Sequence, residues 1–84
     1  MQSSLIGKIE KARRYSTEKN RILFLDFTSS FRGEHGDYNV YYKQGKWNCS
    51  CAFFSQWGTC SHVMTLQKIL EEMLPPEAAR YPQH

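Results

Sequence analysis

Two short pairs of metal-binding residue types lie close together in the second half of the chain. Cys49 and Cys51 are separated by one residue, Cys60 and His62 are separated by one residue, and eight residues lie between the pairs. Three thiolates and one imidazole fill the four positions of a tetrahedral Zn²⁺ and leave none for water or substrate. Cysteines without a shared ligand have no reason to cluster so closely. The pattern therefore predicts one structural zinc ion held by these four side chains.

Other candidate ligands are poorer. His35 lies in a glycine-flanked segment and His84 is the last residue, so neither belongs to a pair with ligand spacing. A carboxylate such as Asp37 is a weaker zinc ligand than a thiolate.

The odd number of cysteines argues against a disulfide framework. Thiolate ligation needs a reducing compartment, so we expect an intracellular, cytoplasmic protein. The sequence shows no signal peptide or membrane-spanning run, so no membrane partner is expected.

The spacing of the ligands constrains the backbone. Residues two apart in a strand are separated by about 6.6 Å, whereas two sulfurs on one zinc ion approach to about 3.8 Å. The chain must therefore bend at Ser50. Residues two apart in a helix project about 200° from one another, so Cys60 must precede a helix while His62 lies in its first turn. There the helix dipole favours a thiolate and a neutral imidazole, which are the metal-binding forms.

Hydrophobic periodicity predicts the elements that position these ligands. Helices are expected from Ser3 or Ser4 to about Tyr15 and from residues 59–61 to about Leu74, and strands over 21–28, 38–43 and 46–51. The residues Gln44 and Gly45 fit a two-residue hairpin loop, which places Tyr42 opposite Trp47 and Val40 opposite Cys49. The apolar residues expected to shield the site from water are Phe53, Phe54 and Trp57.

We therefore predict a small zinc-stabilised α+β domain over residues 1–84. It comprises an N-terminal helix, a three-stranded antiparallel sheet and a C-terminal helix packed through a Cys₃His zinc knuckle. A basic helix and connector occupy residues 1–19, and the zinc finger occupies 20–74 with its metal core at 45–70. Residues 75–84 form a flexible tail without predicted regular structure.

The pattern CxC–x₈–CxH, preceded by Gly45-Lys46-Trp47 and followed by an apolar helix, resembles the SWIM zinc finger family, in its small stand-alone prokaryotic version. The resemblance implies a module of a β-hairpin and a helix, with Cys49, Cys51, Cys60 and His62 as the zinc ligands. SWIM modules occur beside helicase-like ATPases, transposases and ubiquitin ligases and are taken to bind DNA or protein. This chain has no such neighbour, so a host enzyme does not supply its function by analogy.

The first hypothesis for function is a protein-interaction adaptor in a DNA-related process. Trp57 and Met64 are its possible protein contacts, because an apolar anchor can dominate the energy of an interface. A single exposed Met or Trp is also common without any such role.

Direct DNA binding is the alternative. Residues 1–21 carry six basic and two acidic side chains, whereas the rest of the chain has a slight acidic excess. The possible nucleic-acid contacts are Lys8, Lys11, Arg13, Arg14 and Arg21. The same face could simply be the solvated side of an amphipathic helix. An enzyme is not expected, because four protein ligands close the metal site and no nucleophile–base pair is evident. No small-molecule substrate is therefore expected either.

Overall fold

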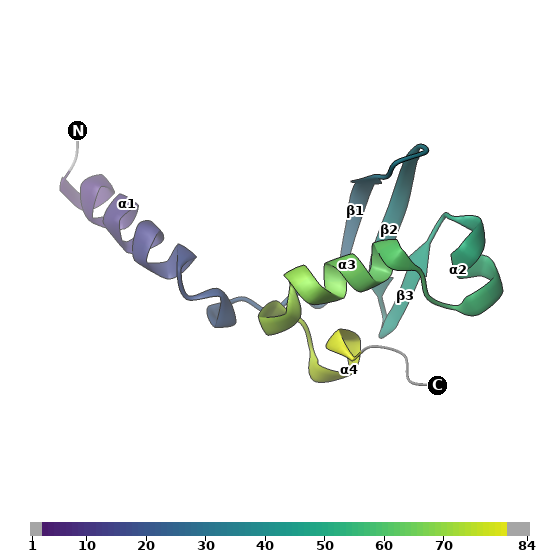
Figure 1. The fold of residues 1–84 in the computed structure, drawn as a ribbon. Helices are drawn as coiled ribbons and strands as arrows, with labels where there is room; N and C mark the ends of the chain where they lie inside the picture. Colours follow the sequence, from purple (N-terminus) through teal and green to yellow (C-terminus); the bar gives the residue numbers. More distant parts are fainter. Residues whose placement is uncertain (1–2, 81–84) are drawn as a thin grey trace.

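The computed structural model describes residues 3–80, which form a small α+β domain with an N-terminal helix that projects from it (Figure 1). The predicted fold class is therefore confirmed. In chain order the elements are α1 (Ser3–Ser16), η1 (Lys19–Arg21), β1 (Phe27–Arg32), β2 (Asp37–Lys43), β3 (Lys46–Cys49), α2 (Ala52–Trp57), α3 (Ser61–Ile69), η2 (Glu71–Met73) and α4 (Pro76–Ala79). The η elements are single 3₁₀ turns.

The three strands form an antiparallel sheet in the order β1-β2-β3. The hairpin between β2 and β3 turns at Gln44 (φ 53°) and Gly45 (φ 78°), and two left-handed residues are the signature of the favoured two-residue loop. This turn fixes the register, in which Tyr42 pairs with Trp47 and Val40 pairs with Cys49. The predicted register is therefore confirmed.

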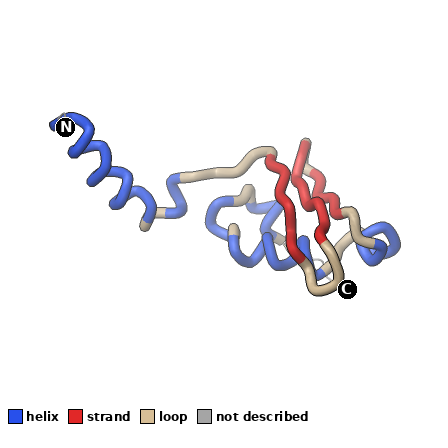
Figure 2. The backbone as a smooth tube through the Cα atoms, turned by 90° about the horizontal axis from the view of Figure 1, so that it is seen from above, coloured by secondary structure: helices blue, strands red, loops and turns tan. Residues whose placement is uncertain are grey.

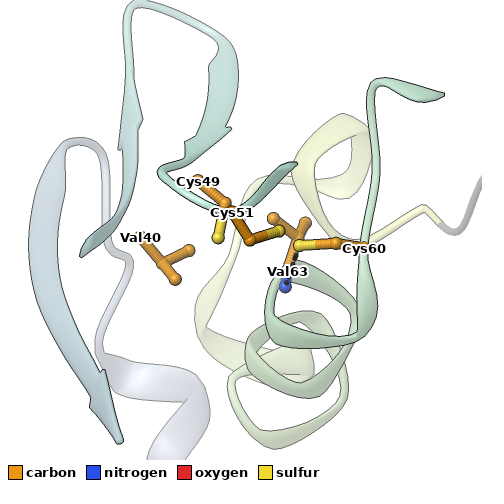
Figure 3. Close-up of a cluster of buried hydrophobic side chains, with 5 residues drawn as sticks. All are labelled: Val40, Cys49, Cys51, Cys60 and Val63. Atoms are coloured by element: carbon orange, nitrogen blue, oxygen red, sulfur yellow. Dashed lines mark hydrogen bonds between the residues drawn. The ribbon is translucent and has the colours of Figure 1, made fainter. Parts of the chain in front are cut away.

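Inward-facing residues of the sheet supply two small cores. The sulfur cluster consists of Val40, Cys49, Cys51, Cys60 and Val63 and lies between the sheet and α3 (Figure 3). The C-terminal cluster consists of Tyr42, Leu74 and Ala78. Trp47 packs against both clusters, so one side chain connects the part of the core that contains the thiols to the part that contains α4.

The first strand lies elsewhere than predicted. Residues 21–28 were expected to be extended and covered, but β1 begins only at Phe27, and Leu23 and Leu25 are 56% and 65% exposed. The reason is that β2 turns back at Lys43, so no strand lies opposite the residues before Phe27. Asp26 instead accepts a hydrogen bond from the backbone of Gln44 at 3.2 Å. The third strand likewise ends at Cys49, two residues earlier than expected.

The C-terminal helix is also shorter than predicted. It ends at Ile69 and is followed by η2, an extended Leu74 and the short helix α4. The expectation that the tail lacks regular structure is wrong for residues 76–79, because Pro76 starts a new helical turn and Ala78 is buried. The Ala78 carbonyl accepts hydrogen bonds from Trp47 Nε1 at 2.9 Å and Gln67 Nε2 at 3.1 Å. Residues 81–84 of the predicted tail, with His84, lie outside the described residues.

The N-terminal helix α1 projects away from the rest of the molecule (Figure 2). The side chains of residues 4–16 are all exposed. The Cα radius of gyration is 16.4 Å, whereas a compact chain of this length would have about 12 Å. Within the described part of the chain, no helix has both the length and the apolar character needed to cross a membrane.

Candidate metal centre

The four side chains predicted to bind metal converge between the sheet and α3. One ligand atom from each of Cys49, Cys51, Cys60 and His62 lies within 4.8 Å of the others. The Nδ1 atom of His62 is 3.6 Å from Cys49 Sγ and 3.7 Å from Cys60 Sγ. On a tetrahedral zinc ion a nitrogen and a sulfur would be about 3.6 Å apart and two sulfurs about 3.8 Å apart. The donor set and its spacing therefore fit a zinc ion.

The first pair of ligands is presented by a bend at the end of β3. Cys49 is the last residue of that strand, and Cys51 directly precedes α2 with an extended backbone. Ser50 lies at the bend and is fixed to β2 twice: its backbone N donates to the Asn39 carbonyl at 3.1 Å, and its Oγ accepts from the Asn39 N–H at 3.0 Å. The predicted bend at Ser50 is confirmed. It brings together two sulfurs that a straight strand would keep apart.

The second pair lies at the start of α3. Gly58, with φ 75°, ends α2 and returns the chain toward the sheet. Cys60 then caps α3, and its sulfur accepts a hydrogen bond from the Val63 N–H at 3.5 Å. His62 is the second residue of the helix, as its spacing from Cys60 requires. Figure 3 shows the three sulfur atoms of the cluster facing one another between the two segments.

The imidazole of His62 is held between two aromatic rings. Tyr38 stacks on it with ring centroids 4.4 Å apart and an interplanar angle of 29°. Phe31 meets it edge-on at 4.8 Å and 64°. Phe31 and Tyr38 are register partners on β1 and β2, so one cross-strand pair fixes the orientation of the ring. Sequence reasoning missed this pair, although the alternation of β2 places Tyr38 on the same face as Val40.

Burial opposes ionisation of Cys51 and Cys60, and the two thiols differ in what offsets it. Burial raises the pKa of Cys51, but the backbone amide of Phe54 and the other donor side chains of the site outweigh it and bring that pKa to about 7. Burial and the two neighbouring sulfurs raise the pKa of Cys60 to about 12, against the lowering effect of the Val63 amide. Because adjacent thiolates repel one another, all three can coexist only with a cation to neutralise them.

The segment between the two ligand pairs contributes to the site only in part. Phe54 packs against the sulfur cluster as predicted. Phe53 and Trp57, which were also expected to shield the site, are 55% and 66% exposed. They stack on one another with centroids 6.1 Å apart, since they lie four residues apart on α2. Sequence reasoning misplaced them because it predicts no helix over residues 52–57, and helix α2 turns one of its faces to solvent.

The predicted nucleic-acid contacts lie far from the thiols. Lys8, Lys11, Arg13 and Arg14 are exposed on α1, and Arg21 is exposed on η1. The N-terminal helix that carries the first four extends away from the sheet (Figure 2). Of the poorer candidate ligands, His35 and Asp37 are outside the metal-binding group. Met64, a predicted protein contact, is 37% exposed and lines a groove beside the thiols.

The groove beside the thiols opens between α2 and the start of α3. It is lined by Tyr38, Cys51, Ala52, Phe53, Cys60, Ser61, His62 and Met64. The two segments that carry the ligand pairs therefore also carry an exposed apolar surface. Searches against family models, curated proteins and solved structures find no match for this chain.

Proposed function

We propose that the protein is a zinc-stabilised binding module of the SWIM type, which recognises a macromolecular partner and catalyses no reaction. The observation that carries the proposal is the convergence of Cys49, Cys51, Cys60 and His62, whose ligand atoms lie within 4.8 Å of one another. Three thiolates favour zinc over magnesium or calcium. A bound zinc ion would supply a structural cross-link between β3 and α3, and the four protein donors would leave it no open position for a substrate.

The metal can be tested by elemental analysis of protein purified without oxygen. We expect one zinc per chain, and we expect a chelator to abolish most of the circular dichroism of the module, because metal binding energy is folding energy in small zinc domains. His62→Ala should lose the zinc. The matched control is His35→Ala, which removes an exposed histidine outside the metal-binding group and should retain it. Full ellipticity in protein without stoichiometric metal would contradict the proposal.

We further propose that the partner is a protein and that it docks on the apolar patch formed by Phe53, Trp57 and Met64. Phe53 and Met64 line one groove, and Trp57 stacks on Phe53 beside it. Large aromatic side chains on a rigid element are the residues that most often dominate interface energies. The zinc ligands would hold α2 and α3 in the positions that assemble this patch. Thiolate ligation also favours a reducing location, which we propose is the cytoplasm.

The interface can be tested by affinity purification of the tagged full chain. We expect a stoichiometric protein partner that is lost with Trp57→Ala, while zinc content and circular dichroism stay unchanged. Gln56→Ala is the matched control, because it truncates an exposed neighbour on the same helix. A partner recovered equally well with Trp57→Ala and with the wild type would rule out the apolar patch as its binding site.

Direct DNA binding is the second candidate and rests on the basic side chains of residues 3–21. It predicts an affinity for duplex DNA that falls steeply with salt, because each contacted phosphate releases counterions. Lys8→Ala together with Lys11→Ala should flatten that salt dependence. The control pair, Lys43→Ala with Lys46→Ala, removes the same charge from the β2–β3 hairpin. The absence of any mobility shift with duplex or single-stranded DNA would remove this candidate.

A further inference from the structure

The N-terminal arm, defined as residues 3–21, has an apolar stripe that nothing in the described chain covers. Leu5 and Ile9 are 47% and 43% exposed, and Ala12 extends the same stripe by one turn. The helix has 14 residues and contains Gly7. Isolated helices shorter than about 12–15 residues are marginal in water, and an internal glycine weakens them further. A helix of this kind needs a surface on which to bury its stripe.

The arm and the rest of the molecule carry opposite charge. The arm has six basic and two acidic side chains, and residues 22–80 have five basic and six acidic ones. Two of these acidic residues, Glu71 and Glu72, are exposed in η2, which is separated by one residue from Ile69, itself 62% exposed. We call Ile69, Glu71 and Glu72 the acidic end. It offers an apolar centre beside negative charge, which complements a helix that carries an apolar stripe and, on an adjoining face, Lys8 and Lys11.

The base of the arm, which is η1 together with the last turn of α1, holds the helix away from the acidic end of its own chain. The Arg21 side chain pairs with Glu18 and lies over the Tyr15 ring, with its guanidinium carbon 4.7 Å from the ring centroid. The backbone N–H of Glu18 also donates to the Tyr15 carbonyl at 2.9 Å. These contacts fix η1 relative to the end of α1 and direct the helix away from the molecule (Figure 1).

The base of the arm lies beside the acidic end of the same chain. η1 packs against η2, and the Phe24 N–H donates to the Met73 carbonyl at 2.7 Å. A two-fold axis close to this point would carry each arm across the η2 segment of the other copy. The same arrangement would cover Leu23 and Leu25, which are exposed at this junction.

We propose that the protein forms a dimer in which the arm of each copy docks on the acidic end of the other. Such a contact is isologous and therefore closes at two copies. A nucleic acid would neutralise Lys8 and Lys11 but would leave Leu5 and Ile9 in water. A second copy accounts for both the charge and the exposed stripe. The proposal does not depend on the identity of the metal or of any other partner.

The proposal can be tested by reversing the charge of each side separately. The arm variant is Lys8→Glu with Lys11→Glu, and the acidic-end variant is Glu71→Lys with Glu72→Lys. By sedimentation velocity we expect a wild-type dimer, and a dissociation constant raised at least tenfold for each variant alone. An equimolar mixture of the two variants should dimerise again, because each arm then meets an acidic end of opposite sign. One chain with all four substitutions should also dimerise.

Two further variants check the apolar stripe and the specificity of the charge effect. Ile9→Ser should weaken the dimer to a similar extent, because it removes the centre of the stripe. Lys43→Glu with Lys46→Glu changes the charge by the same amount on the hairpin and should leave the dimer intact. All variants should retain the metal content of the wild type, since the substituted residues are exposed and outside the metal-binding group.

Two results would overturn the proposal. One is a wild-type protein that stays monomeric at every concentration measured. Another is a mixture of the two charge variants that fails to dimerise. If the wild type is monomeric and its arm variant loses affinity for duplex DNA, the arm is assigned to nucleic acid instead.

Discussion

The ring of Tyr38 stacks on the imidazole of His62, with centroids 4.4 Å apart, and the backbone of Gly33 makes room for it. A Cβ atom at Gly33 would lie 2.8 Å from Cε2 of Tyr38, which is closer than two carbon atoms can approach. The turn between β1 and β2 therefore controls the orientation of a metal ligand that lies on a different element.

Gly33→Ala should loosen the metal site without touching a ligand. The methyl group displaces the Tyr38 ring, which then no longer orients His62. Loss of a group that orients a ligand costs about 10–100-fold in metal affinity. Competition with a chromophoric chelator measures this change. Gly7→Ala is the control, because a Cβ there meets nothing within 4 Å, and it should leave the affinity unchanged. Equal affinities for the two variants would mean that Tyr38 does not position His62.

Cys51→Ser should unfold the domain, whereas Ser50→Ala should only weaken it. The first substitution removes a donor from the metal site. The second removes the hydroxyl that accepts from the Asn39 N–H, and one such hydrogen bond is worth about 1 kcal/mol. Thermal unfolding followed by circular dichroism, together with zinc content, distinguishes the two. Similar losses from both substitutions would be incompatible with metal ligation by Cys51.

Metal affinity should rise with pH, and its slope should change near neutral pH. With a pKa of about 12, Cys60 is protonated in the absence of metal and must release its proton on binding, so it contributes about tenfold in affinity per pH unit. With a pKa of about 7, Cys51 is ionised above pH 7, so it releases a proton on metal binding only below that value. The dependence should therefore be steeper below pH 7 than above it. Chelator competition across this range measures the slope, and an affinity independent of pH would contradict thiolate ligation.

Trp47→Phe should release α4 from the rest of the domain. The substitution removes the hydrogen bond from the indole to the Ala78 carbonyl, at a cost of about 1 kcal/mol in the free energy of unfolding. It also trims the ring that packs on both clusters. Hydrogen exchange should accelerate at the Ala78 and Ala79 amides, which donate to Pro75. Trp57→Phe alters an exposed ring and should change stability by less than about 0.5 kcal/mol. Unchanged exchange in the Trp47 variant would show that the indole hydrogen bond does not hold α4 in place.

The ligand cluster could be predicted from sequence because its geometry is local. The two-residue spacing of Cys49 and Cys51 requires a bend, and that of Cys60 and His62 requires a helix boundary between them. Both features are present. The hairpin register was equally accessible, because Gln44-Gly45 defines the loop length and so the residue that faces Cys49.

The remaining errors concern contacts that depend on distant parts of the chain. Residues 21–26 have the composition of a strand, but strand formation needs a partner, and the length of β2 provides none. The apolar periodicity of α3 continues through Leu70 and Met73, so the pattern does not reveal that the α-helix ends at Ile69. The contact of Phe31 and Tyr38 with His62 depends on the β1–β2 register, which no motif in the sequence predicts.

All four donor atoms come from the fourteen residues from Cys49 to His62, and in the described chain the remainder of α3, η2 and α4 come after them. During synthesis the sheet and the complete donor set leave the ribosome before α4 does, and chains generally fold in this direction. We therefore expect the metal site to form first and α4 to close against Trp47 afterwards.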